Sequence, residues 1–311
     1  MIPEEAIGGT IAARLRGSRR DWSGGLFAAG LLAALLASLA ILVALLWDVV
    51  AKGAPVLAER GTDFLTAGPS SFPAAAGIGA AIAGSFAMVL IVAVVAFPLG
   101  IGAAVYLEEY ASDTWLSRLI AANVRNLAGV PSIVYGILGL VLFVEALNHI
   151  VDILDIGSLL SGGLTLSALV LPIVIITTSE ALRSVPPSLR EAAFGVGATR
   201  WEVIRHHVLP VAAPGILTGT VLSLARAFGE TAPLLLVGAA TGFFSTGNAG
   251  VLDRLLHSRY SALPVQILNW SLLPDPEFKD LAAAGIVVMM TILLLVNGVA
   301  IWLRNRYERT W

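Results

Sequence analysis

Two residues of opposite charge stand inside a long apolar run of the sequence. Arg226 and Glu230 lie four positions apart within residues 209–237, so they would share one face of a continuous helix. An ionised side chain that faces lipid costs from about 2.5 to over 10 kcal/mol. We therefore expect both side chains to face a bundle interior or an aqueous path.

The chemistry of this pair suits a tetrahedral oxyanion. A guanidinium offers several donors in a planar fork, and the Glu230 carboxylate can accept a hydrogen bond from a protonated phosphate oxygen, which sulfate lacks at neutral pH. The alternative is an ion pair that only neutralises itself. We favour an anion path, because apolar side chains could replace an ion pair whose two charges only neutralise each other, at little cost in stability.

No residues are spaced as a catalytic or metal site. The chain has no cysteine and four scattered histidines, and no nucleophile, base and orienting group stand at a recognisable spacing. A phosphate-binding loop needs a lysine, and neither Lys52 nor Lys279 has the required neighbours. We expect no enzyme activity and no cofactor on this chain, so any ATP and Mg²⁺ would belong to a partner ATPase.

The composition is that of an integral membrane protein. Of 311 residues, 57% are hydrophobic and 13% charged, and the net charge of -2 does not favour a nucleic-acid partner. Arginines precede the first apolar run, as in a signal peptide. That run is long enough to cross about 30 Å of hydrocarbon, however, so we interpret it as a retained span.

The predicted fold class is an all-α membrane protein with six transmembrane helices. The spans are residues 26–47, 79–107, 127–147, 164–182, 209–237 and 281–303. Pro98 supplies a place for a kink in the second. The expected division is a cytoplasmic segment 1–25, a first span with a periplasmic loop 26–78, a core 79–303 with coupling helices at 184–209, and a tail 304–311.

The distribution of Lys and Arg predicts the orientation. Thirteen lie on the side of both termini and five on the other, with Arg226 inside a span, so both termini are expected in the cytoplasm. The outer loops would be 48–72, 148–163 and 238–280. The last contains aromatic residues suited to the membrane interface or to a partner, and we favour the interface: Phe243, Phe244, Tyr260 and Trp270.

A polar stretch, residues 184–214, connects the fourth and fifth spans. It predicts two short helices, the first starting near Pro186 and the second at Thr199, whose spacing to Glu202 is that of a capping box. Gly197 would break the chain between them, and Pro210 would start the next span. The first helix is expected to share one shallow apolar face: Leu189, Ala192, Ala193 and Val196. The second has an apolar stripe: Trp201, Ile204 and Val208.

This connector resembles the EAA signature of ABC-importer permeases, E-A-A-x3-G-x9-I-x-L-P, whose short helices dock into a cleft on the ATPase subunit. The matching residues are Glu191, Ala192, Ala193, Gly197, Leu209 and Pro210. The resemblance implies an ATPase-coupling role for them, together with Trp201 and Ile204. The chain departs from the signature at His207, where the family usually has isoleucine.

Three further stretches resemble the phosphate-specific A-type permeases of bacterial ABC importers. They are residues 126–136, 225–233 and 262–270, and the likeness runs from about residue 79 to 304. It implies a type I importer fold in the inner membrane and a heterodimer with a homologous C-type permease. It also implies an ATP-binding subunit dimer and a periplasmic phosphate-binding protein as partners, with membrane lipid around the spans.

The function predicted from the sequence is passage of inorganic phosphate, with Arg226 and Glu230 lining the path. Two alternatives stay open. One is a permease of the same family for another oxyanion, and the other is a membrane scaffold that relays phosphate status to a signalling kinase.

The charge distribution generates a test of topology. We expect cysteines introduced by Ser18→Cys and Thr310→Cys to resist impermeant thiol reagents in intact cells, because both termini should be cytoplasmic. The native chain has no cysteine that would label in the background. Labelling of either site from outside, before the cells are permeabilised, would reverse the orientation.

Overall fold

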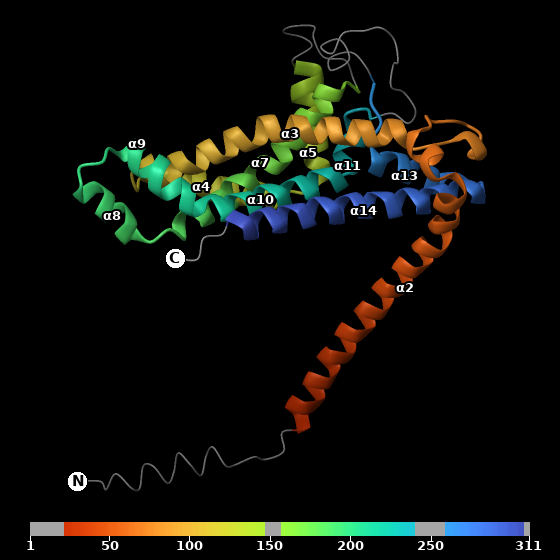
Figure 1. Ribbon diagram of the computed structural model, residues 1–311, viewed down its shortest axis with the longest axis horizontal. Coiled ribbons are helices and arrows are strands. Elements are labelled where there is room, and N and C mark those ends of the chain that lie inside the picture. Colours follow the sequence, from red (N-terminus) through yellow and green to blue (C-terminus); the bar gives the residue numbers. More distant parts are fainter. Residues whose placement is uncertain (1–21, 147–156, 240–258, 308–311) are drawn as a thin grey trace. The chain divides into compact units, whose positions relative to one another are not determined.

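The computed structural model describes residues 22–146, 157–239 and 259–307, and almost all of this part is helical (Figure 1). Phe243 and Phe244, two of the predicted interfacial aromatics, lie outside the described residues. The helices in chain order are α2 (Trp22–Thr66), η1 (Pro73–Ala75), α3 (Gly79–Val105), η2 (Tyr106–Tyr110), α4 (Trp115–Ala128), α5 (Ser132–Gly139), η3 (Leu140–Ala146), α7 (Leu159–Arg183), α8 (Pro187–Gly195), α9 (Arg200–Val203), η4 (Ile204–Val208), α10 (Leu209–Gly229), α11 (Ala232–Leu236), α13 (Leu263–Leu272) and α14 (Pro276–Tyr307). η1 is a 3-10 turn, and η2, η3 and η4 are π-helical turns.

The chain divides into two compact units, Met1–Ala51 and Lys52–Trp311, with the boundary inside α2. In the first unit the described part of α2 exposes apolar side chains on all sides and contains the predicted first span. A helix that is apolar all round is suited to lipid. Within the predicted loop 48–72, α2 continues as far as Thr66, with a kink at Gly61, whose φ of 43° and ψ of -117° are not helical.

Among the described residues, five helices are long and apolar enough to cross a membrane, and a bent pair raises the number to six if it counts as one span. The pair is α4 with α5 and η3, bent by 104°. The predicted third span, 127–147, therefore corresponds to a helix that starts only at Ser132 and follows a separate α4. Pro131 lacks an N–H and restricts the residue before it, and these restrictions favour the break.

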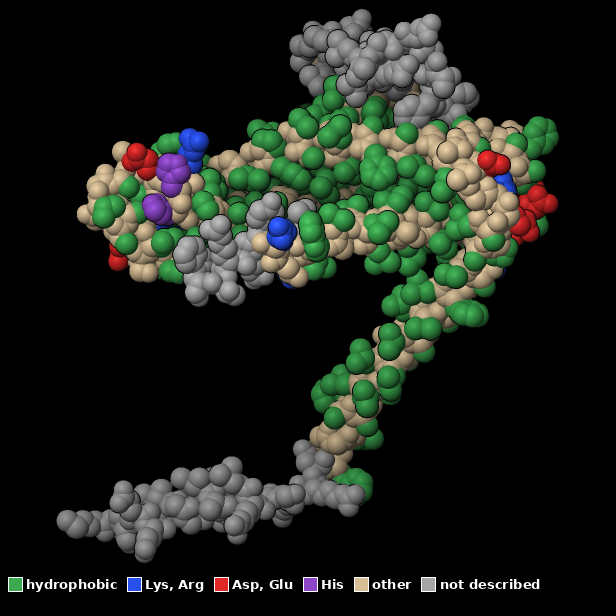
Figure 2. All heavy atoms as spheres, viewed as in Figure 1, with side chains coloured by type: hydrophobic (Ala, Val, Ile, Leu, Met, Phe, Trp, Pro, Cys, Tyr) green, Lys and Arg blue, Asp and Glu red, His purple; other side chains and the backbone are tan. Residues whose placement is uncertain are grey.

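Helix α7 is the centre of the second unit. It is the most buried of the five candidate spans, and it packs against α3, α4, α5 and α10. Small residues let the backbones approach: a Cβ on Gly100 of α3 would lie 2.7 Å from Cγ1 of Val174 on α7. Such contacts are the usual packing of membrane helices. Figure 2 shows hydrophobic side chains over the middle of this unit and most of the visible charged side chains near its two ends.

The predicted fifth span, 209–237, is interrupted. Helix α10 ends at Gly229, Glu230 is extended with φ -76° and ψ 126°, and α11 begins at Ala232. Pro233 explains the interruption, because a proline at this position would clash with the carbonyl of Gly229 in a continuous helix. Arg226 is therefore helical and Glu230 is not, which corrects the prediction that both lie on one helix.

The helix that contains the fifth span begins before residue 209, within the connector. Helix α9 runs through the π-helical turn η4 into α10, so Pro210 does not start a new helix. The N–H of Leu209 bonds to the carbonyl of Ile204, five residues back. This wider turn accommodates Pro210, which has no N–H to continue the α-helical pattern.

The predicted outer loop 238–280 contains a buried helix. Most residues of α13 are buried, and α14 begins at Pro276, ahead of the predicted sixth span. Tyr260 and Trp270 are 1% and 3% exposed within the protein, so the interfacial interpretation of these two residues is wrong. Trp270 packs instead beside Phe64 of α2 and Phe278 of α14.

The close packing of α5 on α11 can be tested at Gly136. A Cβ there would lie 2.7 Å from Cα of Pro233, which is backbone and cannot rotate away. We expect Gly136→Ala to destabilise the protein by about 1–3 kcal/mol through overpacking. The measurement is the thermal midpoint of the detergent-purified protein.

Gly102→Ala is the matched control, since it is also a helical glycine and nothing lies within 4 Å of its Cβ position. Alanine favours a helix over glycine by about 1 kcal/mol, so this variant should keep or gain stability. Equal stability of the two variants would contradict the packing of α5 against α11.

Candidate functional site: the connector, its root and the Arg226–Glu230 pair

The connector between α7 and α10 contains the two predicted short helices. Helix α8 starts at Pro187, as proline favours, and Gly197 follows it with φ +85°, a conformation that non-glycine residues rarely adopt. Thr199 and Glu202 form the predicted capping box at the start of α9. The hydrogen bonds from the backbone N–H and hydroxyl of Thr199 lower the pKa of the Glu202 carboxyl. The predicted order in the connector, a first helix, a break at Gly197 and a second helix with a capping box, is confirmed.

The predicted coupling residues separate into exposed and buried sets. The exposed ones are Glu191, Ala192, Gly197, Trp201 and Pro210, and His207 is exposed as well. Ala193 and Ile204 are 5% and 1% exposed, and Leu209 is half-buried. The expected common face of α8 is therefore divided, since Ala193 packs inward while Val196 is 85% exposed. The buried residues support the connector, and the exposed ones form its outer surface.

The inner side of the connector packs on the ends of the spans. Ala193, Val203 and Val208 belong to one buried cluster with residues of α7 and α10 and with Ala104 of α3. Phe194 and Trp201, in contrast, are 48% and 54% exposed. The connector thus combines an apolar attachment to the bundle with an exposed surface that carries two aromatic side chains.

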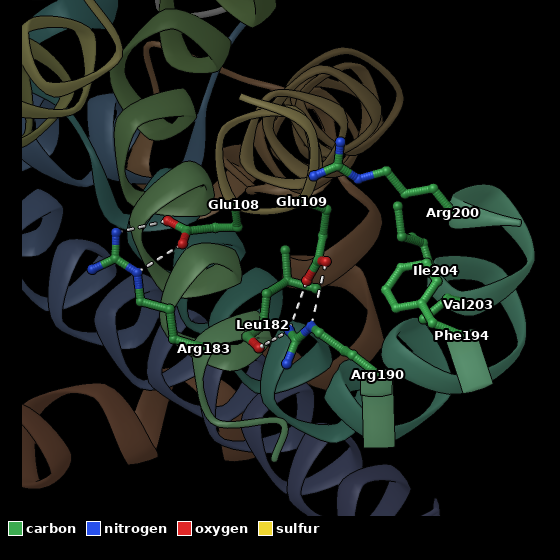
Figure 3. Close-up of a pocket in the computed structure, with 9 residues that line it drawn as sticks. All are labelled: Glu108, Glu109, Leu182, Arg183, Arg190, Phe194, Arg200, Val203 and Ile204. Carbon is green, nitrogen blue, oxygen red and sulfur yellow. Dashed lines mark hydrogen bonds and ion pairs between the residues drawn. The ribbon is translucent and has the colours of Figure 1, made fainter. Parts of the chain in front are cut away.

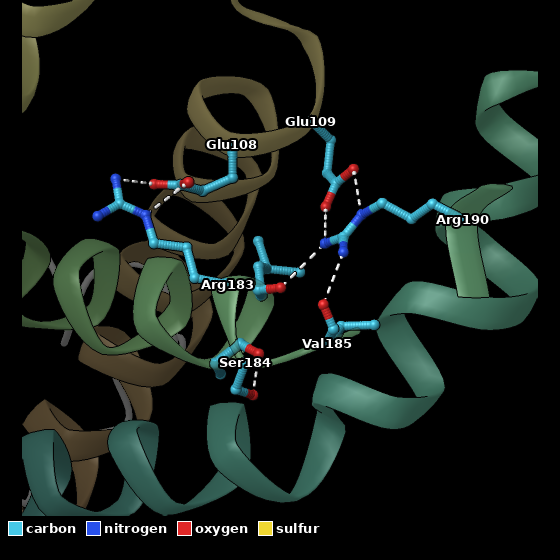
Figure 4. Close-up of polar contacts among 8 residues, drawn as sticks. Glu108, Glu109, Arg183, Ser184, Val185 and Arg190 are labelled. Carbon is cyan, nitrogen blue, oxygen red and sulfur yellow. Dashed lines mark hydrogen bonds and ion pairs between the residues drawn. The ribbon is translucent and has the colours of Figure 1, made fainter. Parts of the chain in front are cut away.

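An ion pair joins α8 to the end of α3 (Figure 4). Arg190 Nη2 lies 2.7 Å from Glu109 Oε1, and Arg190 Nε donates to Glu109 Oε2 at 3.4 Å. The same guanidinium donates to the carbonyls of Leu182 and Val185, at 2.9 and 2.8 Å, where α7 ends. Both side chains are largely buried, 22% exposed for Arg190 and 9% for Glu109.

A second pair lies beside the first and does not involve the connector. Arg183 donates to both carboxylate oxygens of Glu108 at 2.8 Å, joining the end of α7 to the turn that follows α3. Arg183 is 60% exposed. Both pairs line a hollow of about 390 Å³, together with Phe194, Arg200 and Ile204 of the connector (Figure 3).

Sequence reasoning did not find these four charged residues as a group. Glu108 and Glu109 end one span, while Arg183 and Arg190 follow another about 75 to 81 positions later. The available signal was that two adjacent acidic residues follow one span and two arginines follow another, which is compatible with ion pairs between the two helix ends. Only the packing of α3 on α7 showed which acid meets which arginine.

Arg226 and Glu230 form an ion pair, as their spacing suggested, although the helix ends between them. Arg226 Nε lies 3.3 Å from Glu230 Oε1, and the two side chains are 47% and 17% exposed. Within the described residues, the terminal nitrogens of Arg226 make no hydrogen bond. An anion could therefore approach the outer edge of this guanidinium while Glu230 holds its other edge.

Near the pair, two helical segments with interruptions pack together: α4 with α5, and α10 with α11. Tyr135 of α5 shares a buried cluster with Ala227 of α10 and Leu234 of α11. Its hydroxyl donates to the carbonyl of Leu127 at 2.9 Å, near the end of α4. The interruption before α5 and the interruption after α10 thus lie on elements that pack together. In the described part of the chain, no group of three His, Asp or Glu residues could hold a metal ion.

Comparison with known proteins places the chain in a family. Residues 96–309 match the model of the binding-protein-dependent transport system inner membrane component family. The phosphate transport system permease protein PstA of Yersinia pestis is 35% identical over 86% of this chain and 85% of that protein. The probable ABC transporter permease protein YqgI of Bacillus subtilis is 32% identical over 88% of this chain and 92% of its own length.

Solved structures share the fold at low sequence identity. An inward-facing structure of the MetNI methionine ABC transporter has a TM-score of 0.58 at 18% identity, covering 75% of this chain and 98% of that one. A bacterial ABC transporter for the acidic polysaccharide alginate has a TM-score of 0.59 at 15% identity, covering 94% and 100%. With its apolar spans, its connector and these matches, the chain belongs to the binding-protein-dependent transport system inner membrane components, a family of multi-pass ABC transporter permeases.

Proposed function

We propose that the chain is the transmembrane permease subunit of an ATP-driven importer of inorganic phosphate. The observation that carries this proposal is the likeness to phosphate permeases over most of the chain, including 35% identity to the PstA protein of Yersinia pestis. A second PstA relative, from Mycobacterium leprae, is 36% identical over 72% of this chain. Two features of the chain agree with this proposal: the connector, which could meet an ATPase, and the Arg226–Glu230 pair, which could contact an anion.

Arg226 and Glu230 are the proposed substrate-path residues. The guanidinium supplies a positive charge and planar donors to a desolvated phosphate within a largely apolar segment. Glu230 fixes one edge of the guanidinium and can accept a hydrogen bond from monohydrogen or dihydrogen phosphate. Arg226 is 47% exposed, so its guanidinium is accessible to an anion that reaches this side of the chain.

The remaining components are proposed to be separate chains. The sequence contains no phosphate-binding loop, so ATP and Mg²⁺ would be held by an ATP-binding subunit dimer. A homologous C-type permease would complete the membrane path, and a periplasmic phosphate-binding protein would deliver the substrate. The exposed surface of α8 and α9 would meet the ATPase.

The Arg226 hypothesis predicts an order of activities. We expect phosphate uptake to fall from wild type to Arg226→Lys and to be abolished in Arg226→Gln, with assembly unchanged. Lysine keeps the charge and loses the planar fork, whereas glutamine loses both. Radiolabelled phosphate uptake is measured beside membrane abundance, with sulfate and molybdate as competitors.

The double variant Arg226→Gln with Glu230→Gln separates the two interpretations of the pair. If the pair only neutralises itself, the single change strands a carboxylate and lowers abundance, and the double change restores abundance and uptake together. A double variant that is abundant and fully active would refute the anion path. Competition by sulfate as strong as by phosphate would assign the chain to another oxyanion.

The coupling surface can be tested at Ala192, which is exposed on α8. We expect the Ala192→Trp variant to fold and to stay in the membrane, because the larger side chain would extend into solvent. The same variant should release the ATPase and stop uptake. A helix that docks closely in a cleft tolerates little added volume. The measurement is recovery of the ATPase with the purified permease.

Ala74→Trp serves as the control, since Ala74 is also exposed and precedes the start of α3 at Gly79, whereas the connector contacts Glu109 just after α3 ends. It should leave ATPase recovery unchanged. Normal recovery and normal uptake in Ala192→Trp would show that this face of α8 does not meet the ATPase.

A further inference from the structure

We propose that the Glu109–Arg190 pair is a rigid joint that makes α8 move as one body with the ends of α3 and α7. This inference rests on the proposed coupling function and names the residues that would carry the movement. The two residues act as positioning residues and touch neither substrate nor nucleotide. The geometry points to them because one guanidinium bridges three separate elements.

The joint is defined by four hydrogen bonds from Arg190. Two reach the Glu109 carboxylate in the turn after α3, and one reaches each of the carbonyls of Leu182 and Val185 where α7 ends. Arginine can do this because its planar fork aims several donors in fixed directions (Figure 4). Arg190 itself is on α8, so this side chain fixes α8 to both spans.

Burial distinguishes this pair from an ordinary surface ion pair. Glu109 is 9% exposed and Arg190 22%, so removing either partner would leave a charge with little water around it. Exposed ion pairs contribute little, whereas breaking a buried one strongly disfavours the arrangement that leaves the other charge alone. The neighbouring Glu108–Arg183 pair is also an arginine–carboxylate pair. Its Arg183 is 60% exposed, however, and neither residue is on the connector.

Apolar contacts alone would hold α8 less specifically. Only Ala193 among the residues of α8 is buried, and Leu189 packs partly buried against the same cluster. Two such apolar contacts fix the direction of a short helix less than hydrogen bonds do, because the hydrophobic effect is not directional. The four directional bonds of Arg190 therefore supply the orientation that the packing of α8 does not.

The first test measures coupling in the assembled transporter. We expect Glu109→Gln to keep ATP hydrolysis but to lower the phosphate transported per ATP about tenfold, because α8 can then move without its spans. Arg190→Lys should lie between wild type and Glu109→Gln. The control Glu108→Gln should change this ratio little, because its partner Arg183 is exposed.

A double variant separates positioning from stability. Glu109→Leu with Arg190→Met replaces the buried charges by apolar side chains, which commonly keeps stability. We expect normal abundance and a ratio that stays low, since the directional bonds are gone. A double variant that regains the full wild-type ratio would overturn the joint, as would a Glu109→Gln variant with an unchanged ratio.

The second test does not depend on the substrate. Spin labels on Ser188→Cys in α8 and Leu99→Cys in α3 use exposed positions of a chain without native cysteine. In an otherwise cysteine-free complex, we expect one narrow distance that stays the same with and without ATP, and a broad distribution in the Glu109→Gln background. A distance that changes with ATP in the unmodified joint would refute the proposal. Absence of phosphate uptake by wild type would instead contradict the proposed function and leave this measurement valid.

Discussion

The absence of water inside a bilayer is the constraint on which the rest of this structure depends. Each backbone N–H and C=O in hydrocarbon needs a partner within the protein, so the spans are helices and interruptions are confined to buried or cavity-lining positions. The interruption at Glu230 fits this condition, because the flanking Ala227 and Leu234 are buried together in one cluster. At the connector, where water is accessible, the reason is local: the π-helical turn lets the helix continue past Pro210, which has no N–H.

Close packing of these helices depends on small residues. Between apolar helices in lipid, association comes mainly from van der Waals contact, so glycine and alanine at the contacts bring backbones together. Helix α7 receives its neighbours in this way, with Gly100 facing Val174 and Gly219 facing Thr177. Because α7 contacts α3, α5 and α10, it is positioned to relate the connector at one end to the interrupted helices farther along.

Two ion pairs of this chain differ in how far they are removed from water. Arg226 and Glu230 pair beside an interruption, and the guanidinium is partly exposed. Glu109 and Arg190 pair at the root of the connector, where their hydrogen bonds are directional and largely shielded from water. The role that we propose for the first pair is transient contact with a substrate, and for the second it is holding a helix in place. The difference in exposure, more than the residue types, separates the two roles.

The sequence alone determined the membrane class, most of the span positions and the helix, glycine break and capped helix of the connector. Those features depend on local properties: apolar length, the missing N–H of proline, and the three-residue spacing of Thr199 and Glu202. Tertiary structure decided that residues 263–272 form a buried helix and that α10 ends before Glu230. It also decided that Glu109 meets Arg190. Hydropathy does not distinguish a buried helix in a loop from an interfacial one, and pairing of residues about 81 positions apart depends on how α3 packs against α7, which no local pattern encodes.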